Sequence, residues 1–560
     1  MDEQLAKRQQ TKGTEQPSDF VQKSKKMFFS GVVVLTISNI VIKLMGLLLK
    51  VPLTNMIGDT GMGYFNLAYA IYKWFYMVST AGLPVAISIM VSESRTRRRE
   101  KEIKKIYNVT LTLFLAIGII GTAAMMFGSG LFAELQGAPD AKFCIMAIAP
   151  TLFFICISSA IRGYFQGFQN MTPTAISQII EAFSKLAVGL LLGYYAKNIA
   201  NNGEGYPIEI VAAYAIAGLT IGVLFGMIFL VLSKCLYKPI FNMAIEEDTN
   251  IRPADEIAKR LLWTAIPITI SASVMSLTDL VDSMIIIRRL KSIGLEEEYA
   301  LKLYGNYTSL AVPMFNLPPV LIYPISYSIV PLISSALAYG SRERTRTIIN
   351  SALKVTSIIA LPCALGMSVL SEPILLMFFK PELVETGAPL LAVLALAVFF
   401  VSILSITNAI LQSCKLERKP IIAMLAGAAV KLVSSYILIG IPSIGIYGTP
   451  ISTLLCYITI TAMNIFFVVK YVKVIPSVGR VFFRPLSAAV VCALTALGAY
   501  KFAFDRFLSV KPATVMSIGC AAIVYVVVLF LIHGVDKDDI LLLPKGEKIY
   551  NILHKMHLLK

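Results

Sequence analysis

The sequence alternates between long hydrophobic stretches and short polar segments. We count fourteen stretches of mostly apolar residues, each about as long as the 20 residues that an α-helix needs to cross a bilayer. They are residues 28–56, 62–91, 106–130, 143–165, 174–195, 209–233, 261–287, 307–338, 347–378, 387–412, 420–440, 447–470, 484–503 and 513–533. The longest segment between them, 234–260, is too short for a catalytic domain. The pattern therefore predicts an all-α polytopic membrane protein with fourteen transmembrane helices.

The composition supports this interpretation and narrows the possible functions. Apolar residues make up 57% of the 560 residues and charged residues 15%, whereas soluble domains are about half apolar and about a quarter charged. The eight cysteines form no C-x-x-C pair, and the three histidines lie at or beyond the last hydrophobic stretch. The sequence also contains no phosphate-binding G-x-x-x-x-G-K-[ST] loop. We therefore expect no enzymatic active site, no metal centre and no cofactor.

The basic residues indicate how the chain is oriented in the membrane. If the N-terminus is cytoplasmic, about 35 of the 50 Lys and Arg residues fall on the cytoplasmic side and about 10 on the outer side. Seven of them lie in the single segment 95–105. This asymmetry predicts that both termini are cytoplasmic, and it explains the net charge of +17. A nucleic-acid patch is the other interpretation of 95–105, but an ordinary topology signal explains it more simply, so we expect no nucleic-acid partner.

Two short patterns recur along the chain. Gln166, Pro173 and Lys185 recur as Gln412, Pro420 and Lys431, and Pro84-x-x-x-Ser88 recurs as Pro324-x-x-x-Ser328. The copies are six hydrophobic stretches apart, an even number, so both have the same orientation in the membrane. This predicts two pseudo-symmetric six-helix lobes, as in many secondary transporters. The lobes would be residues 28–233 and 261–470, joined by a cytoplasmic linker at 234–260. An appended helix pair at 484–533 and cytoplasmic tails at 1–27 and 534–560 complete the predicted organisation.

Basic residues inside the predicted helices are candidates for a binding cavity. A charged side chain near mid-bilayer costs on the order of 2.5–3.5 kcal/mol, so one that persists usually faces protein or water. Lys43 and Lys50 are two helical turns apart and share a face with Gly46. The remaining candidates are Lys73 and the matching pair Lys185 and Lys431. Together they predict a positively charged cavity for an anionic ligand such as a phosphate, although Lys50 could instead reach the interface.

Acidic residues in the predicted helices allow several roles. Asp279 and Asp282 share a helix face, where they could bind a cation or proton or pair with the lysines of the first helix. Glu181 is four residues before Lys185, a spacing that suits a local ion pair as well as a functional role. Arg288 lies at the outer end of the seventh stretch, where it is either a cavity residue or an interfacial anchor.

Several sequence motifs together resemble one family of membrane proteins. The stretch from Arg162 through Gly163, Gln166 and Pro173 to Glu181 resembles the loop between the fourth and fifth helices of the stage V sporulation protein B family. Shorter motifs are similar too: Lys43-x-x-Gly46-x-x-x-Lys50, Gly82-x-Pro84 and Asp279-x-x-Asp282. This family belongs to the polysaccharide-transporter branch of the multidrug/oligosaccharidyl-lipid/polysaccharide flippase superfamily, which includes the lipid II flippases.

The resemblance implies a fold and a mode of action. It implies fourteen helices, two lobes, and a groove for a lipid tail beside the helix pair at 484–533. It also implies a central cationic cavity, with Lys43, Lys50, Lys73 and Arg288 as its basic residues. The implied function is that of a flippase, which moves a polyprenyl-diphosphate-linked saccharide, lipid II foremost, from the inner to the outer leaflet by alternating access. The alternatives are a MATE-like cation-coupled multidrug exporter and a flippase for another lipid-linked polysaccharide of capsule, teichoic acid or spore cortex.

The resemblance also implies a cellular setting. The expected location is the bacterial plasma membrane, with a monomeric multi-pass protein whose partners are the bilayer, the lipid-linked oligosaccharide and cell-wall synthesis proteins. Energy for transport would come from Na⁺ or H⁺ or from the membrane potential alone.

Overall fold

The computed structural model describes residues 17–534 apart from 98, 200–203, 238–251, 339–340, 508 and 533. The described residues form helices joined by short turns. Twelve helical segments among them are long and apolar enough to cross a membrane. One of the twelve, Val41–Arg95, includes residues 41–56 of the predicted stretch 28–56 and all of the predicted stretch 62–91. Helix α10, which contains the predicted stretch 261–287, is not among the twelve.

The helices of the first half of the chain are called the N-lobe below. Its helices are α2 (Pro17–Thr80), α3 (Leu83–Thr96), α4 (Glu100–Phe127), α5 (Ser129–Leu135), η1 (Pro139–Ala141), α6 (Lys142–Ile148), α7 (Pro150–Gly167), α8 (Thr172–Asn198) and α9 (Ile208–Leu236). Helix α2 is not continuous, because Gly58 has φ 74° and ψ −176° and separates the predicted stretches 28–56 and 62–91. The helix begins at Pro17, so it extends into the segment that we predicted as a polar tail.

The helices of the second half are called the C-lobe and the appended pair below. The C-lobe contains α10 (Ala254–Ser292), α11 (Glu297–Asn306), η3 (Tyr307–Ala311), α12 (Val312–Phe315), α13 (Pro319–Ala338), α14 (Arg342–Val369), α15 (Ser371–Leu376), α16 (Pro381–Ser413), α17 (Arg418–Ile439), η4 (Gly445–Tyr447), α18 (Gly448–Phe467) and η5 (Val468–Val472). The appended pair is η6 (Gly479–Phe483) with α19 (Arg484–Phe507), followed by α20 (Val510–Leu531). The predicted stretch 307–338 is interrupted between α12 and α13, where Pro318 and Pro319 lack the amide hydrogens that would continue the helix.

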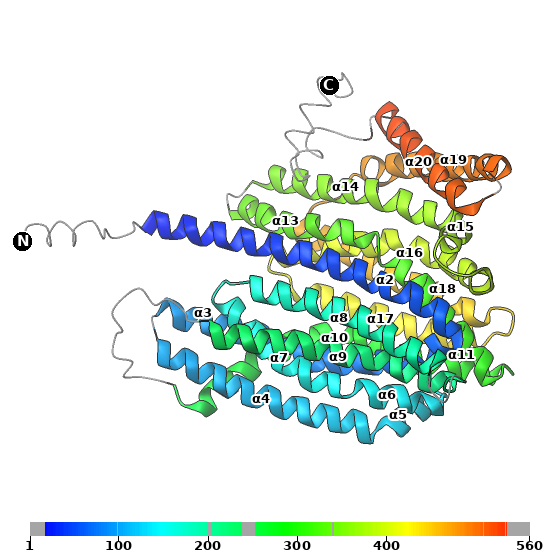
Figure 1. Cartoon of the computed structure of the whole chain (residues 1–560). Coiled ribbons are helices and arrows are strands. Elements are labelled where there is room, and N and C mark those ends of the chain that lie inside the picture. Colours follow the sequence, from blue (N-terminus) through cyan, green and yellow to red (C-terminus); the bar gives the residue numbers. More distant parts are fainter. Residues whose placement is uncertain are drawn as a thin grey trace, which may run out of the picture.

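Most long helices lie side by side in one bundle (Figure 1). Helices α4 and α5 lie at one edge, and α19 and α20 lie at the other edge, where they pack beside α14 and α15. Helix α2 runs through the middle and packs against α8 and α9 of the N-lobe and α10 and α11 of the C-lobe. Helices α5, α11 and α15 gather at the end of the bundle that contains the break in α2. We call this the Gly58 end.

The two lobes contact each other closely at the Gly58 end. A methyl group at Gly63 would lie 2.7 Å from the carbonyl oxygen of Leu301, and one at Gly305 would collide with the carbonyl of Asp59. Only glycine therefore allows the backbones of α2 and α11 to approach this closely. The backbones of the two lobes are therefore in direct contact at this end.

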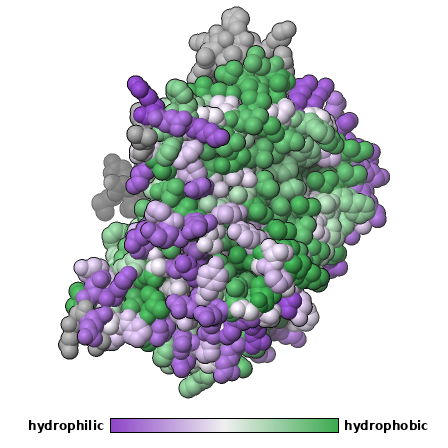
Figure 2. Space-filling model, turned by 90° about the vertical axis from the view of Figure 1, so that its right-hand side faces the viewer, coloured by the Kyte–Doolittle hydropathy of each residue, from purple (hydrophilic) through white to green (hydrophobic). Residues whose placement is uncertain are grey.

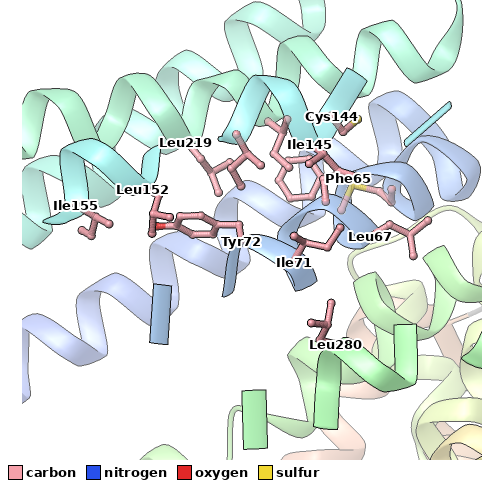
Figure 3. Close-up of a cluster of buried hydrophobic side chains, with 14 of the residues drawn as sticks. Phe65, Leu67, Ile71, Tyr72, Cys144, Ile145, Leu152, Ile155, Leu219 and Leu280 are labelled. Carbon is pink, nitrogen blue, oxygen red and sulfur yellow. The ribbon is translucent and has the colours of Figure 1, made fainter. Parts of the chain in front are cut away.

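Helix α2 is also central to the hydrophobic core (Figure 3). Its Tyr72 lies beside Leu152 of α7, whereas its Ile71 faces Leu280 of α10 on the opposite side. All four side chains are at most 6% exposed. The same helix thus joins the cores of both lobes.

The outer surface carries many large apolar side chains. Phe127, Phe183, Leu191 and Leu236 are each at least 60% exposed, which suits helices that face lipid rather than water. Figure 2 views the molecule from the Gly58 end, where hydrophilic residues gather over the lower part and hydrophobic residues cover a broad region above them. These surfaces agree with a multi-pass membrane protein.

The repeated sequence patterns coincide with repeated backbone geometry. Gln169 and Lys415 lie two residues after the ends of α7 and α16 and have the left-handed conformation, with φ of 60° and 59°. Each amide donates a hydrogen bond to the carbonyl three residues before it, Gln166 at 2.8 Å and Gln412 at 3.0 Å. In each case the donor follows the acceptor by three residues, so Gln166 and Gln412 occupy equivalent turns in the two lobes.

Candidate functional site

A cavity of about 610 Å³ lies between the two lobes. Its volume is in the range of small-molecule binding sites. Charged and polar side chains contribute much of its lining: Lys43, Lys50, Asn66 and Lys73 from α2, Asp279, Asp282 and Ser283 from α10, Thr308 from η3, Lys431 from α17 and Thr453 from α18. Four tyrosines also line it: Tyr69, Tyr304, Tyr307 and Tyr457. The lining thus combines a charged centre with aromatic walls.

Both aspartates of this central cavity are paired with lysines. Lys73 Nζ lies 2.6 Å from Asp279 Oδ2, and Lys431 Nζ lies 2.8 Å from Asp282 Oδ2 and 3.7 Å from Asp279 Oδ1. Ser435 Oγ donates a further hydrogen bond of 3.0 Å to Asp282 Oδ1. These ion pairs use Lys73 and Lys431 rather than the lysines of the first predicted helix. Because Lys73 belongs to the N-lobe and the other three charged groups to the C-lobe, the chain of charges also bridges the lobes.

The other two lysines have only neutral partners among the described residues. Lys50 Nζ donates hydrogen bonds to Thr308 O at 3.0 Å and to Asn66 Oδ1 at 3.5 Å. Lys43 Nζ lies 4.8 Å from the centroid of the Tyr323 ring, at a distance typical of a cation–π contact. Neither ammonium group forms a described ion pair. With four lysines and two aspartates in its lining, the cavity carries two excess positive charges.

A second cavity of about 350 Å³ lies within the N-lobe. Lys185 Nζ is 2.5 Å from Glu181 Oε1, and Arg162 Nη2 is 2.9 Å from Glu181 Oε2. Gly46, Lys50 and Tyr69 line both cavities, so the two adjoin one another. We expected Lys185 and Lys431 to line one cavity together. They occupy matching positions in sequence, but they line different cavities.

A column of glycines on α9 lets the Glu181–Lys185 pair of α8 lie close against α9. We did not predict a role for these glycines. Gly218, Gly222 and Gly226 recur every four residues and face α8. A methyl group at Gly222 would lie 2.5 Å from Lys185 Cγ, and one at Gly226 would lie 3.2 Å from Glu181 Cβ. The G-x-x-x-G spacing is a known signal for close packing of membrane helices, so the sequence contained the information needed to find it.

The remaining predicted site residues lie outside both cavities, apart from Gly46, which has open space where a side chain would begin. Arg288 is exposed, and its Nη2 donates a 2.9 Å hydrogen bond to Glu134 O. Gly163 packs against Pro84, whose carbonyl oxygen would be 2.8 Å from an added methyl group. Gln166 lies in the last turn of α7, and Pro173 lies in the first turn of α8, which suits its missing amide hydrogen. These residues shape the fold around the cavities.

No metal centre is found in the part of the chain that the structure describes, where no group of three or more His, Cys, Asp or Glu side chains could hold an ion. The carboxylates of Asp279, Asp282 and Glu181 all face ammonium or guanidinium groups. The chemistry of both cavities is therefore that of ion pairs with an excess of positive charge.

A charged cavity inside a bundle of helices long enough to cross a membrane is typical of secondary transporters. Comparison with known proteins identifies the kind. Residues 28–337, more than half of the chain, match the family described as "Polysaccharide biosynthesis protein", and the chain belongs to this family. Residues 308–437 also match the family described as "MatE". These are families of membrane transporters rather than of enzymes.

Individual relatives agree with this classification. The chain is 25% identical over 536 residues to "Stage V sporulation protein B" of Bacillus subtilis (strain 168), covering 93% of this chain and 98% of that protein. It is 23% identical over 416 residues to "Lipid II flippase MurJ" of the same organism, covering 72% and 76%. Among solved structures, "Lipid II flippase MurJ, inward closed conformation" matches with a TM-score of 0.66 at 17% identity, over 90% of this chain and 99% of that one.

Proposed function

We propose that the protein is a flippase that moves a polyprenyl-diphosphate-linked saccharide, foremost lipid II, from the inner to the outer leaflet. The observation that carries this proposal is the pair Lys43 and Lys50, two ammonium groups without a described carboxylate partner in the central cavity. A diphosphate is the anion that such a pair suits, because hydrogen bonds from ammonium groups to phosphate oxygens are charge-assisted and about twice as strong as neutral ones. The family match and the two named relatives support the same substrate class.

The proposed topology has fourteen crossings with both termini in the cytoplasm. To the twelve candidate helices it adds a second crossing within Val41–Arg95 and one crossing by α10. The Gly58 end then faces the outside, where the contact between α2 and α11 closes the cavity. Toward the opposite end, Lys43 and Leu48 of α2 are exposed. A lipid-linked substrate could enter along this side of α2 with its tail still in the bilayer, in the groove that we propose beside α19 and α20.

The proposed cycle depends on shielding the headgroup from hydrocarbon. A bare diphosphate cannot cross the bilayer core at an acceptable free-energy cost, whereas Lys43 and Lys50 would compensate its charge during the passage. The lobes would then close behind the headgroup and separate at the Gly58 end. An inside-negative membrane potential favours outward movement of negative charge by about 2.3 kcal/mol per charge per 100 mV.

A cation-coupled drug exporter is the second candidate, because residues 308–437 match the MatE family. In this structure, however, the aspartates that would attract a cation already face Lys73 and Lys431. The charge left over in the central cavity is positive, which favours an anionic substrate.

Proteoliposomes containing the full-length protein would test the proposal. A fluorescent lipid II should become accessible at the opposite leaflet in vesicles that contain the wild type and not in vesicles that contain Lys50→Met. Lys380→Met, at an exposed lysine outside both cavities, is the matched control and should transport normally. Exchange of organic cations for Na⁺ or H⁺, without binding of any diphosphate lipid, would overturn the flippase assignment. Transport of other lipid-linked saccharides in preference to lipid II would retain the flippase and change its substrate.

A further inference from the structure

The N-lobe cavity has features of a binding site that the proposed cycle does not use. Its own charged residues, Arg162, Glu181 and Lys185, come from α7 and α8, away from the C-lobe. It adjoins the central cavity at Lys50, Gly46 and Tyr69, which line both. A ligand held by Lys50 in the central cavity therefore lies beside the N-lobe cavity.

The charges of the N-lobe cavity do not cancel. Arg162 and Lys185 contribute two positive charges, and Glu181 contributes one negative charge. Both oxygens of Glu181 are already occupied, Oε1 by Lys185 and Oε2 by Arg162, which leaves no free carboxylate oxygen to bind a cation. One positive charge remains in a region where uncompensated charge is costly. An anionic group would supply the missing charge.

Polar and aromatic groups beside these charges suit a sugar. The side-chain oxygen of Gln178 is buried and has no hydrogen-bond partner within the described part of the chain. Tyr69 and Tyr76 line the same cavity. A ring face, an unpaired amide oxygen and a cationic group together can hold a saccharide that carries an acidic substituent.

We infer that the N-lobe cavity is a second anion subsite, which takes a carboxylate or phosphate substituent of the carried saccharide while Lys43 and Lys50 hold the diphosphate. This inference rests on the proposed function, because it places two parts of one substrate in two adjoining cavities. The subsite would make the transporter select acidic over neutral saccharides.

The direct test is equilibrium binding to the full-length protein in nanodiscs. Two polyprenyl-diphosphate disaccharides would be compared, one neutral and one carrying a uronic acid. We expect the wild type to bind the acidic lipid at least about tenfold more tightly. Lys185→Gln removes the excess charge but leaves Glu181 paired with Arg162, and Ala182→Leu fills the cavity without changing its charge. Each should abolish the preference for the acidic lipid. Lys185→Gln should keep the affinity for the neutral lipid within about twofold, whereas Ala182→Leu should also lower it because the saccharide loses space; Lys380→Gln should change neither affinity.

Soluble probes separate the subsite from the substrate. Free glucuronate and inorganic phosphate, but not glucose, should raise the melting temperature of the wild type and not that of Lys185→Gln. Equal affinity of the wild type for both lipids, together with no response to either free anion, would overturn the subsite. The wild type could bind no diphosphate lipid and still be stabilised by the free anions, with Lys185→Gln showing no stabilisation. The flippase proposal then fails, and the N-lobe cavity remains a binding site for a free anion. A preference for the acidic lipid that both cavity variants retain would place the selectivity elsewhere and also overturn the inference.

Discussion

Replacing Lys431 by methionine separates lysines that hold the structure together from lysines that bind substrate. Lys431 and Asp282 are only 7% and 5% exposed, and their charged groups are 2.8 Å apart. The substitution leaves Asp282 buried with the Ser435 hydroxyl as its remaining described partner. Removing one member of a buried ion pair typically costs about 3–5 kcal/mol, and a neutral hydrogen bond recovers about 1 kcal/mol. We therefore expect Lys431→Met to lose about 2–4 kcal/mol of stability.

Lys50→Met is the matched comparison, because Lys50 donates to neutral oxygens and leaves no described carboxylate behind. Its loss of stability should be about 0.5–1.5 kcal/mol, the contribution of an ordinary hydrogen bond. Its binding of a diphosphate lipid should fall by about 10- to 150-fold, because a charge-assisted bond contributes about 1.5–3 kcal/mol. The folded fraction of Lys431→Met should bind that lipid almost as well as the wild type.

Unfolding of the purified proteins in detergent, followed by binding measurements on the folded fractions, checks both expectations. The double variant Lys431→Met/Asp282→Asn should be more stable than Lys431→Met alone, because it also removes the unpaired carboxylate. The reasoning is refuted if Lys431→Met unfolds like the wild type, or if the double variant is no more stable than the single one. Asp282→Asn alone should slow transport more than it weakens binding, since Lys431 then competes with Lys73 for Asp279, whose pair with Lys73 joins the lobes.

Three further predictions address the binding residue, the topology and the closed end. Lys43→Ala should abolish transport at near-normal abundance and Lys43→Arg should retain more activity, measured in the proteoliposome assay; full transport by Lys43→Ala would exclude Lys43 as a headgroup ligand. Single cysteines introduced within 95–105 or 342–346 should resist a membrane-impermeant thiol reagent in intact cells, and labelling from outside would reverse the proposed orientation. Gly305→Ala should force α11 away from α2. A cysteine at Thr308 should then react faster with a thiol reagent added at the Gly58 end than the same cysteine does in a protein that keeps Gly305. Equal reaction rates would show that this contact does not close the cavity.

The positions of the helices were predictable from sequence, because interactions within each segment determine whether it forms a helix. A backbone in hydrocarbon must satisfy its own hydrogen bonds, so each long apolar stretch becomes a helix wherever it lies in the fold. The stretch 387–412, for example, lies within α16, and 174–195 lies within α8. The boundaries were less predictable where a helix continues through polar residues. Helix α2 extends back to Pro17 because nothing in that segment interrupts a helix.

The composition of the site was only partly predictable. Glu181 and Lys185 pair on one helix, as their spacing suggested, but their third partner, Arg162, comes from α7. Arg288 matched a motif and yet faces Glu134 outside both cavities. A sequence motif reports which residue types occur together, whereas the rotation of each helix about its axis decides which of them meet.

The sequence by itself determined the class of the protein, the approximate extent of its helices, the internal repeat and the excess of positive charge. These properties depend on composition and on spacings within single helices. Only the tertiary structure decided that Lys431 is neutralised across α10 and α17 while the matching Lys185 is neutralised on its own helix, and that Lys50 has no carboxylate partner among the described residues. Ion pairing depends on distances of a few ångströms between different helices, and packing contacts such as those of Gly222 and Gly305 set those distances.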